Sequence, residues 1–175
     1  MFNLKGQVAV ITGGNGGIGL GIATGIASAG ASVVLAARNV EKMNDAVNRL
    51  QDQGFQASSE AVDVNDEDSI SNLIDGTVNR FGRLDILVNN AGTTIRKDPQ
   101  DYEESEWDHV MDINLKGTFL CSKHAYRHMV NVGGGKIINI GSMTSIFGLD
   151  IGAVYSASKG GVVQLTKSLS NAWAK

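Results

Sequence analysis

The chain has 175 residues, 42% of them hydrophobic, which is enough to bury one ordinary core. Its 15 basic and 18 acidic residues give a formal net charge of −3 and form no run of lysine or arginine, so neither nucleic acid nor an anionic membrane is expected as a partner. The first residues lack the charged start and long apolar stretch of a signal peptide, and no apolar run approaches the roughly 20 residues that cross a bilayer. We therefore expect one domain over residues 1–175, located in the cytoplasm.

Short apolar runs alternate with longer amphipathic stretches along the chain. The pattern predicts strands at 8–11, 32–37, 57–62, 84–88 and 136–140, and helices near 17–30, 40–53, 66–81, 103–132 and 153–174. The fourth helix is expected to break near Asn114, and glycines at 30, 54 and 82 are placed to end three of the others. Because apolar strands joined by crossover helices are typical of parallel sheets, we expect an α/β fold in which a doubly wound parallel sheet lies between two helical layers.

A glycine-rich segment at residues 12–19, with the sequence TGGNGGIG, connects the first expected strand to the first expected helix. A dinucleotide diphosphate needs backbone N–H groups and a helix N-terminus close to it, and glycine leaves room for that approach. Two registers of the dinucleotide-binding pattern fit, one with glycines 14, 16 and 19 and one with glycines 13, 17 and 19. A glycine triad alone more often marks a tight turn, but its position between a strand and a helix favours cofactor binding.

The end of the second expected strand bears on the choice of cofactor. A carboxylate is expected there if the ribose 2′-hydroxyl of NAD is bound, yet the sequence reads Arg38-Asn39. A guanidinium offers charge and a fork of donors to the 2′-phosphate of NADP. We therefore favour NADP over NAD, with a solvated arginine at a helix entrance as the alternative.

Tyr155 and Lys159 stand four residues apart in the last expected helix and should share a face. A tyrosine phenol is a poor base at neutral pH unless a nearby cation favours the phenolate, and Lys159 is placed to provide that cation. The pair is therefore a candidate for acid–base catalysis. The alternative is a half-buried ring beside a solvated charge.

Several separated motifs follow one another in order: the glycine turn, Asn89–Gly92 after the fourth expected strand, Ser142 after the fifth, and Tyr155 with Lys159. On these motifs the chain resembles the short-chain dehydrogenase/reductase family over almost its whole length. The resemblance implies a Rossmann-like fold, a homodimer or homotetramer, and the register with glycines 13, 17 and 19. Combined with the end of the second strand, it predicts that NADP or NAD contacts Thr12, Gly13, Asn15, Gly17, Ile18, Gly19, Arg38, Asn39, Asp63, Val64, Asn90, Ala91, Gly92, Tyr155 and Lys159.

The same resemblance implies catalytic roles for Asn114, Ser142, Tyr155 and Lys159. Tyr155 would exchange a proton with a secondary alcohol or ketone while a hydride moves to or from the nicotinamide, and Ser142 would donate to the substrate oxygen. Lys159 would also hold the nicotinamide ribose, and Asn114 would hold a water that relays protons. The alternatives are a helix break at Asn114 and a capping or turn serine at Ser142.

A narrower resemblance concerns the substrate. Residues 93–96 (TTIR), together with the segments around 128–129 and 135–143, resemble the sugar-acid branch, which includes gluconate 5-dehydrogenases and 2-deoxygluconate 3-dehydrogenases. Arg96 would then meet a substrate carboxylate, the alternative being an exposed loop arginine without a ligand. Two other functions remain open: a 3-oxoacyl-carrier-protein reductase, and a dinucleotide-binding sensor or scaffold without turnover.

Two further features complete the expectations. Cys121, His124 and His128 have helical spacing, but no fourth ligand is evident, so no metal site is expected. Members of the family continue beyond the helix that carries Tyr155 with two more strands and a segment that closes over the substrate. We therefore expect a C-terminally truncated chain that lacks the last strands of the family.

Overall fold

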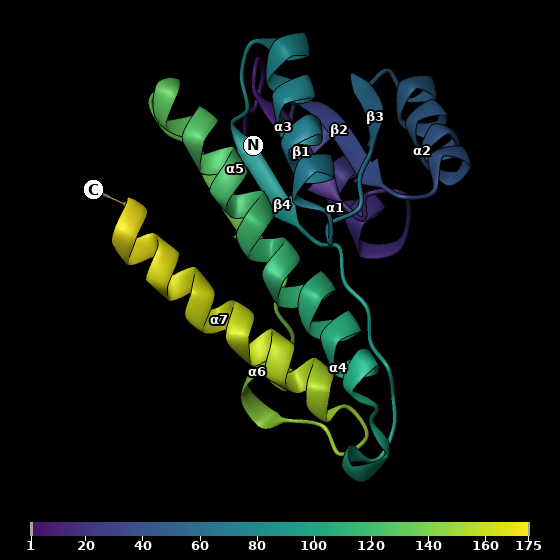
Figure 1. Ribbon diagram of the computed structural model, residues 1–175. Coiled ribbons are helices and arrows are strands. Elements are labelled where there is room, and N and C mark those ends of the chain that lie inside the picture. Colours follow the sequence, from purple (N-terminus) through teal and green to yellow (C-terminus); the bar gives the residue numbers. More distant parts are fainter. Residues whose placement is uncertain (1, 175) are drawn as a thin grey trace. The chain divides into compact units, whose positions relative to one another are not determined.

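The computed structural model describes residues 2–174 and contains a five-stranded sheet with the order β3-β2-β1-β4-β5. Figure 1 labels β1 to β4 of this sheet. The pairs β1–β2, β2–β3 and β1–β4 run parallel, which confirms the expected parallel α/β architecture. The strands are β1 Val8–Thr12, β2 Ser32–Ala37, β3 Ala57–Ala61, β4 Ile86–Asn89 and β5 Lys136–Asn139. The helices are α1 Gly17–Ser28, α2 Val40–Asp52, α3 Glu67–Phe81, α4 Glu104–Met111, α5 Gly117–Asn131, α6 Thr144–Phe147 and α7 Ala153–Trp173, with a 3₁₀ turn at Pro99–Asp101 and a π-helical turn at Asp112–Lys116.

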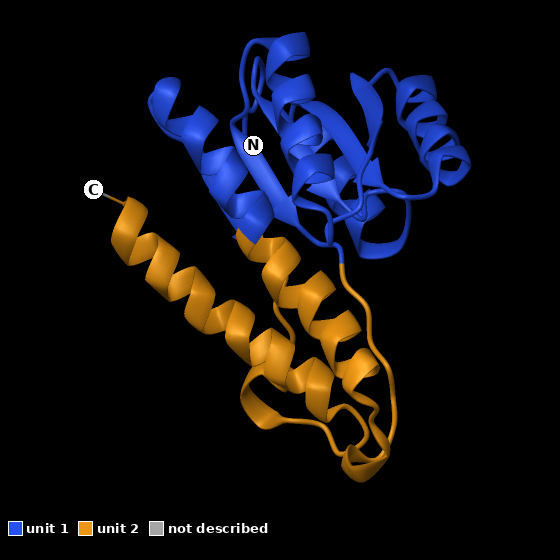
Figure 2. Ribbon diagram, in the orientation of Figure 1, with its two compact units in different colours: residues 1–91, 120–138 blue, residues 92–119, 139–175 orange. Residues whose placement is uncertain are grey.

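The described residues form two compact units (Figure 2). Unit 1 comprises residues 1–91 and 120–138 and holds β1 to β4, α1 to α3 and most of α5. Unit 2 comprises residues 92–119 and 139–175 and holds α4, the π-helical turn, α6 and α7. The expectation of a single domain stays a prediction, and its two ends, Met1 and Lys175, lie outside the described residues.

The core of unit 1 is built on the central strands. Every residue of β1 is buried, and β2 and β4, which flank it, contribute fully buried valine and leucine side chains. Burial of such side chains from water is the main favourable contribution to folding. The carboxyl end of β1 is thereby held firmly between two neighbours, which fixes the start of the glycine-rich turn.

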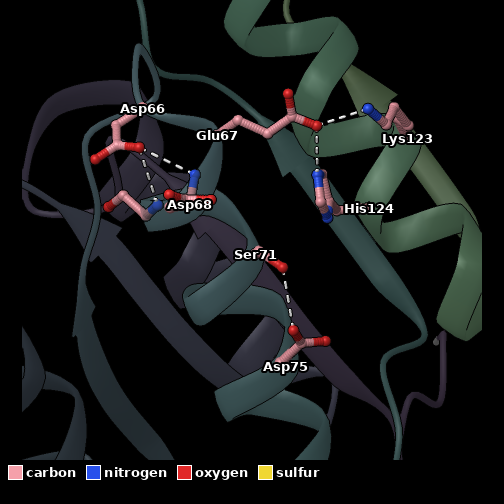
Figure 3. Close-up of polar contacts among 8 residues, drawn as sticks. Asp66, Glu67, Asp68, Ser71, Asp75, Lys123 and His124 are labelled. Carbon is pink, nitrogen blue, oxygen red and sulfur yellow. Dashed lines mark hydrogen bonds and ion pairs between the residues drawn. The ribbon is translucent and has the colours of Figure 1, made fainter.

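Helices α3 and α5 of unit 1 are joined by ion pairs (Figure 3). Glu67 Oε1 accepts hydrogen bonds from Lys123 Nζ at 2.6 Å and pairs with His124 Nε2 at 3.0 Å. Four residues further along α5, His128 Nε2 lies 2.8 Å from Asp75 Oδ1 of α3. These contacts fasten the two helices at their exposed edge.

Most element boundaries agree with the sequence-based expectations to within a few residues. Gly30, Gly54 and Gly82 all have positive φ just past a helix, as expected of left-handed helix ends. The helix does not break at Asn114; a π-helical turn carries it from α4 into α5. The expectation of uniformly apolar strands is wrong for β3 and β5, which are only partly buried because both lie at sheet edges. None of the described helices is long and apolar enough to span a membrane.

Candidate functional site

The glycine-rich turn of unit 1 accepts no side chain at its critical positions. A Cβ on Gly13, where φ is +64°, would lie 2.9 Å from Asn90 Nδ2 and 3.2 Å from Ala91 Cα. A Cβ on Gly19 would collide with the carbonyl oxygen of Gly13, and Gly17 has a φ of +51°, which favours glycine. Glycine is therefore required at positions 13, 17 and 19, the second register, but also at Gly14, where a Cβ would lie 2.9 Å from the carbonyl oxygen of Ile11.

The turn is tied to the end of β4 by hydrogen bonds around Thr12. The Thr12 hydroxyl accepts from the backbone nitrogens of Asn90 and Ala91, both at 3.0 Å, and donates to the Val88 carbonyl at 3.3 Å. The Asn90 carboxamide nitrogen donates to the carbonyls of Thr12 at 3.0 Å and Gly13 at 3.2 Å. Thr12 and Asn90 thus shape the turn itself, in addition to any contact with a cofactor.

The outer rim of the turn is open. Gly16 precedes α1, and no side chain caps the N-terminus of that helix, so the first N–H groups of α1 are available to an anion. Ile18, in the first turn of α1, is 69% exposed and presents apolar surface at the rim, while Asn15 is half-buried. A tightly packed glycine turn that leads into uncapped helix N–H groups fits the diphosphate of a dinucleotide.

Four other residues expected to contact the cofactor follow the carboxyl ends of β2 and β3. Arg38 directly follows β2 and is exposed, with no ion-pair partner among the described residues. The side chain of Asn39 caps α2 by accepting from the Lys42 backbone nitrogen at 2.9 Å, so its oxygen is already engaged. Asp63 Oδ1 accepts from the Asn65 backbone nitrogen at 3.0 Å, and Val64 is buried.

In unit 2, α7 carries Tyr155 and Lys159. Lys159 is 5% exposed, donates from Nζ to the Ile140 carbonyl at 2.6 Å, and has that nitrogen 5.9 Å from the centroid of the Tyr155 ring. Burial disfavours the charged form of the amine and lowers the pKa of Lys159 below its ordinary value. The Tyr155 side chain is half-buried, and its hydroxyl has no hydrogen-bond partner among the described residues. The expected pairing of phenol and ammonium on one helix face is therefore present.

Ser142 lies in the turn that enters α6. Its hydroxyl accepts from the Thr144 backbone nitrogen at 3.2 Å and contacts the Thr144 hydroxyl at 3.0 Å. Ser145 connects this turn to α7, because its hydroxyl accepts from the Ser142 backbone nitrogen at 3.2 Å and donates to the Lys159 carbonyl at 2.9 Å. Ser142 is thus a turn serine, and this role is compatible with donation to a substrate.

Asn114 is fully buried in the π-helical turn. Its carboxamide oxygen accepts from the Thr93 backbone nitrogen at 2.8 Å, and its nitrogen donates to the Thr93 carbonyl and to the Ser158 hydroxyl, both at 2.9 Å. Both donor hydrogens of the amide are used, and the oxygen keeps one lone pair. Asn114 therefore anchors the segment after Ala91 and the helix of Tyr155, and its role in a water relay stays a prediction.

Arg96 lies in the loop that follows Gly92 and is exposed, with no ion-pair partner among the described residues. The loop around it is held: the Tyr102 hydroxyl donates to the Ile95 carbonyl, and Lys97 Nζ pairs with Glu106 at 2.7 Å. The sequence interpretation gave no individual role to Thr93, Ser145 or Ser158. Ser158 had a local signal in its position next to Lys159, and Thr93 in its place in the segment that ends at Arg96.

Two other features lie apart from these residues. Unit 2 has a mainly apolar groove of about 450 Å³ that includes none of the predicted site residues; it is lined by Met111, Asp112, Leu115, Lys116, Phe119, Gly161 and Leu165. The described residues contain no group of three or more potential metal ligands. The His124 and His128 side chains pair with different carboxylates, and burial raises the pKa of Cys121 to about 12.

Comparisons with known proteins give consistent matches. A family model described as "short chain dehydrogenase" matches residues 7–175. The 2-dehydro-3-deoxy-D-gluconate 5-dehydrogenase of Escherichia coli is 41% identical, with 99% of this chain and 68% of the relative covered. The gluconate 5-dehydrogenase of Gluconobacter oxydans is 37% identical, covering 100% of this chain and 68% of the relative.

Solved structures agree with these matches. A gluconate 5-dehydrogenase from Burkholderia cenocepacia, in complex with NADP and tartrate, has a TM-score of 0.94 and 42% identity, with 99% of this chain and 68% of that chain covered. An NAD⁺-bound xylitol dehydrogenase has a TM-score of 0.95 and 32% identity, with 98% of this chain and 66% of that chain covered. The chain thus spans about two thirds of the length of proteins that it resembles in both sequence and fold.

Proposed function

Because the chain belongs to the short-chain dehydrogenase family, whose members are NAD(P)-dependent oxidoreductases of CH–OH groups, we propose that it oxidises a secondary alcohol or reduces the matching ketone, with Tyr155 as the general acid–base. The observation that carries this proposal is the buried Lys159 ammonium, 5.9 Å from the centroid of the Tyr155 ring. A cation so near a phenol favours the phenolate. The glycine turn supports it, because its glycines let the chain pack closely against the Asn90 segment and lead into the uncapped N-terminus of α1, where a diphosphate would approach.

A dinucleotide bound at the glycine turn would supply the hydride acceptor. In alcohol oxidation, the Tyr155 phenolate would take the proton from the substrate hydroxyl while a hydride leaves the carbon that bears this hydroxyl, so that the alcohol becomes a ketone. Lys159 stabilises the phenolate, and the Ser142 hydroxyl donates to the substrate oxygen. In reduction Tyr155 returns the proton. Asn114 positions the helix of Tyr155 through Ser158 and, in this proposal, also binds a water that exchanges protons with solvent.

We assign the substrate to the polyols, sugars and sugar acids. The support is the agreement of relatives named for gluconate and 2-dehydro-3-deoxygluconate, and of a neighbouring structure named for xylitol. Arg96 is the proposed partner of a substrate carboxylate, because its guanidinium is exposed and has no ion-pair partner in residues 2–174. Self-association into a dimer or tetramer and a cytoplasmic location stay predictions.

For the cofactor we propose NADP. Arg38 follows β2 where NAD-binding sites of this architecture carry an acid, and a neighbouring structure with 42% identity contains NADP. Replacing Arg38 by Asp should shift the preference towards NAD, because the carboxylate repels a 2′-phosphate and accepts from a 2′-hydroxyl. Unchanged dissociation constants for NADPH and NADH in this variant would contradict the assignment.

The proposal is tested by a Tyr155→Phe variant, which removes the acid–base hydroxyl and keeps the ring. Binding of NADPH is followed by fluorescence, and oxidation is assayed over a panel of polyols and sugar acids. We expect the original chain to bind NADPH and turn over at least one substrate, and the variant to bind NADPH with nearly all turnover lost. Binding without turnover in the original chain would instead identify a dinucleotide-binding sensor.

A further inference from the structure

The side chain of Lys42 reaches the glycine-rich turn from α2. Lys42 Nζ lies 3.1 Å, and its Cε 3.2 Å, from the position that a Cβ on Gly16 would occupy. Gly16 immediately precedes α1, and Lys42 is the third residue of α2, so two different helix starts of unit 1 meet here. The turn itself, residues 12–19, contains no charged residue. The cation beside the turn, Lys42, is therefore supplied by another element, α2.

The position of Lys42 is not explained by the stability of α2. A cation in the first turn of a helix opposes the helix dipole, which favours acidic residues there. No carboxylate lies within ion-pair distance of the Lys42 ammonium among residues 2–174, although Glu41 and Asp45 are on the same helix. An unpaired ammonium held over a glycine turn is the arrangement expected of a site that binds an anion.

A second cation lies at the same carboxyl end of the sheet. Thr12, which opens the turn, is paired in register with Ala36, so Arg38 stands two residues beyond this pair at the carboxyl ends of β1 and β2. Arg38 is also exposed and lacks an ion-pair partner in the described part of the chain. Asn39, between the two cations, caps α2 and so fixes the start of the helix that carries Lys42. Two cations without ion-pair partners, Arg38 and Lys42, at this end of the sheet suit a ligand group with more than one negative charge.

We propose that Lys42, together with Arg38, binds the ribose 2′-phosphate of NADP. A phosphate monoester carries a charge of about −1.5 to −2 near neutral pH, and two cations match it better than one. The uncapped N–H groups of α1 are available to the diphosphate common to NADP and NAD, so we assign the cation beside them to the group that distinguishes the two. Lys42 is thus a specificity-determining residue, and this inference rests on the proposed dinucleotide function.

The test compares Lys42→Met with Arg49→Met. Both remove one positive charge from an exposed position on α2, but Arg49 lies in its last turn, away from the glycines. Dissociation constants for NADPH and NADH are measured by fluorescence titration, and those for 2′,5′-ADP and 5′-ADP by calorimetry. We expect Lys42→Met to weaken NADPH and 2′,5′-ADP about tenfold with little effect on NADH and 5′-ADP, and Arg49→Met to change none of them. Lys42→Arg should restore most of the NADPH affinity.

Each other outcome is decisive. Equal weakening of NADPH and NADH by Lys42→Met would assign the ammonium to the diphosphate and overturn the inference, as would no change in either. If the unsubstituted chain binds NADPH and Lys42→Met leaves the NADPH dissociation constant unchanged, the inference about Lys42 is wrong but the proposed function stands. If the original chain binds neither dinucleotide, both fall together.

Discussion

The backbone nitrogen of Asn90 donates to the hydroxyl of Thr12 at 3.0 Å, and the carboxamide nitrogen of Asn90 donates back to the Thr12 carbonyl at 3.0 Å. This reciprocal pair joins the carboxyl ends of β1 and β4, which are neighbouring strands. Because the same carboxamide also reaches the Gly13 carbonyl, the shape of the turn depends on a residue more than seventy positions away in the sequence.

Replacing Thr12 by Val should therefore destabilise unit 1 and distort the turn. The substitution leaves the Asn90 and Ala91 N–H groups without their acceptor. An unsatisfied donor costs about 1–3 kcal/mol when fully buried, and less at these part-buried positions. We expect a lower urea midpoint and weaker NADPH binding than in Thr12→Ser, which keeps the hydroxyl. Equal midpoints for the two variants would show that the hydroxyl is dispensable.

Much of this arrangement follows from the sequence, for identifiable reasons. The Tyr155–Lys159 pair depends on a four-residue spacing within one helix, which helical periodicity reveals. The spacing of the glycines predicts the turn, but it fits two registers and the choice between them comes from the family resemblance. The contacts of Asn114 with Thr93 and Ser158, and of Lys42 with the Gly16 region, join residues that lie far apart in the chain. No local pattern encodes them. The sequence likewise predicts a break where the structure has a π-helical turn, because an asparagine inside a helix predicts a disruption and does not indicate which partner satisfies it.

The buried amine of Lys159 predicts an alkaline limit to activity. Burial lowers the pKa of Lys159 below the ordinary value of 10.5, so the ammonium that stabilises the Tyr155 phenolate is lost at a lower pH than for a solvated lysine. We expect kcat/KM to fall on an alkaline limb that begins below 10.5. A Lys159→Arg variant, if it retains activity, should move this limb upward, because a guanidinium stays charged.

The same shift has a defined effect on stability. A lysine whose pKa is lowered in the folded state opposes folding while both states are charged, and the penalty is relieved as the pH rises through the folded pKa towards the unfolded one. Urea midpoints measured on the alkaline side should therefore rise in this window for the original chain relative to Lys159→Met. If the urea midpoints of the two proteins changed in parallel with pH, the lowered pKa of Lys159 would be contradicted.

Glu67 predicts a loss of stability in acid. Hydrogen bonds from Lys123 and then His124 lower the pKa of Glu67 from 4.5 to about 2, so its ionised form is favoured in the folded state. A lowered carboxyl pKa contributes stability that is complete above 4.5 and is lost as the pH falls towards 2. Glu67→Gln should flatten the decline of the urea midpoint in this window. Glu60→Gln, which removes an exposed carboxylate from the edge strand β3, should leave the decline unchanged.

Arg96 predicts a selective effect on acidic substrates. If its guanidinium meets a substrate carboxylate, Arg96→Ala should raise KM for gluconate-type substrates about tenfold, in line with the loss of one charge-assisted hydrogen bond. The KM for xylitol, which has no carboxylate, serves as the internal control and should not change. Unaltered gluconate kinetics would remove Arg96 from the site.

Cys121 predicts a thiol that is inert until the protein opens. The side chain is 1% exposed in α5, and burial raises its pKa to about 12. Since the thiolate is the reactive form, both access and ionisation oppose modification near neutral pH.

The native chain should resist a disulfide reagent at about pH 8, while the urea-unfolded chain should react promptly, as for a free cysteine. The slow native reaction should follow the opening of this part of unit 1, and any substitution that destabilises the unit, such as Thr12→Val, should accelerate it. Prompt reaction of the native chain would mean that α5 does not shield the thiol.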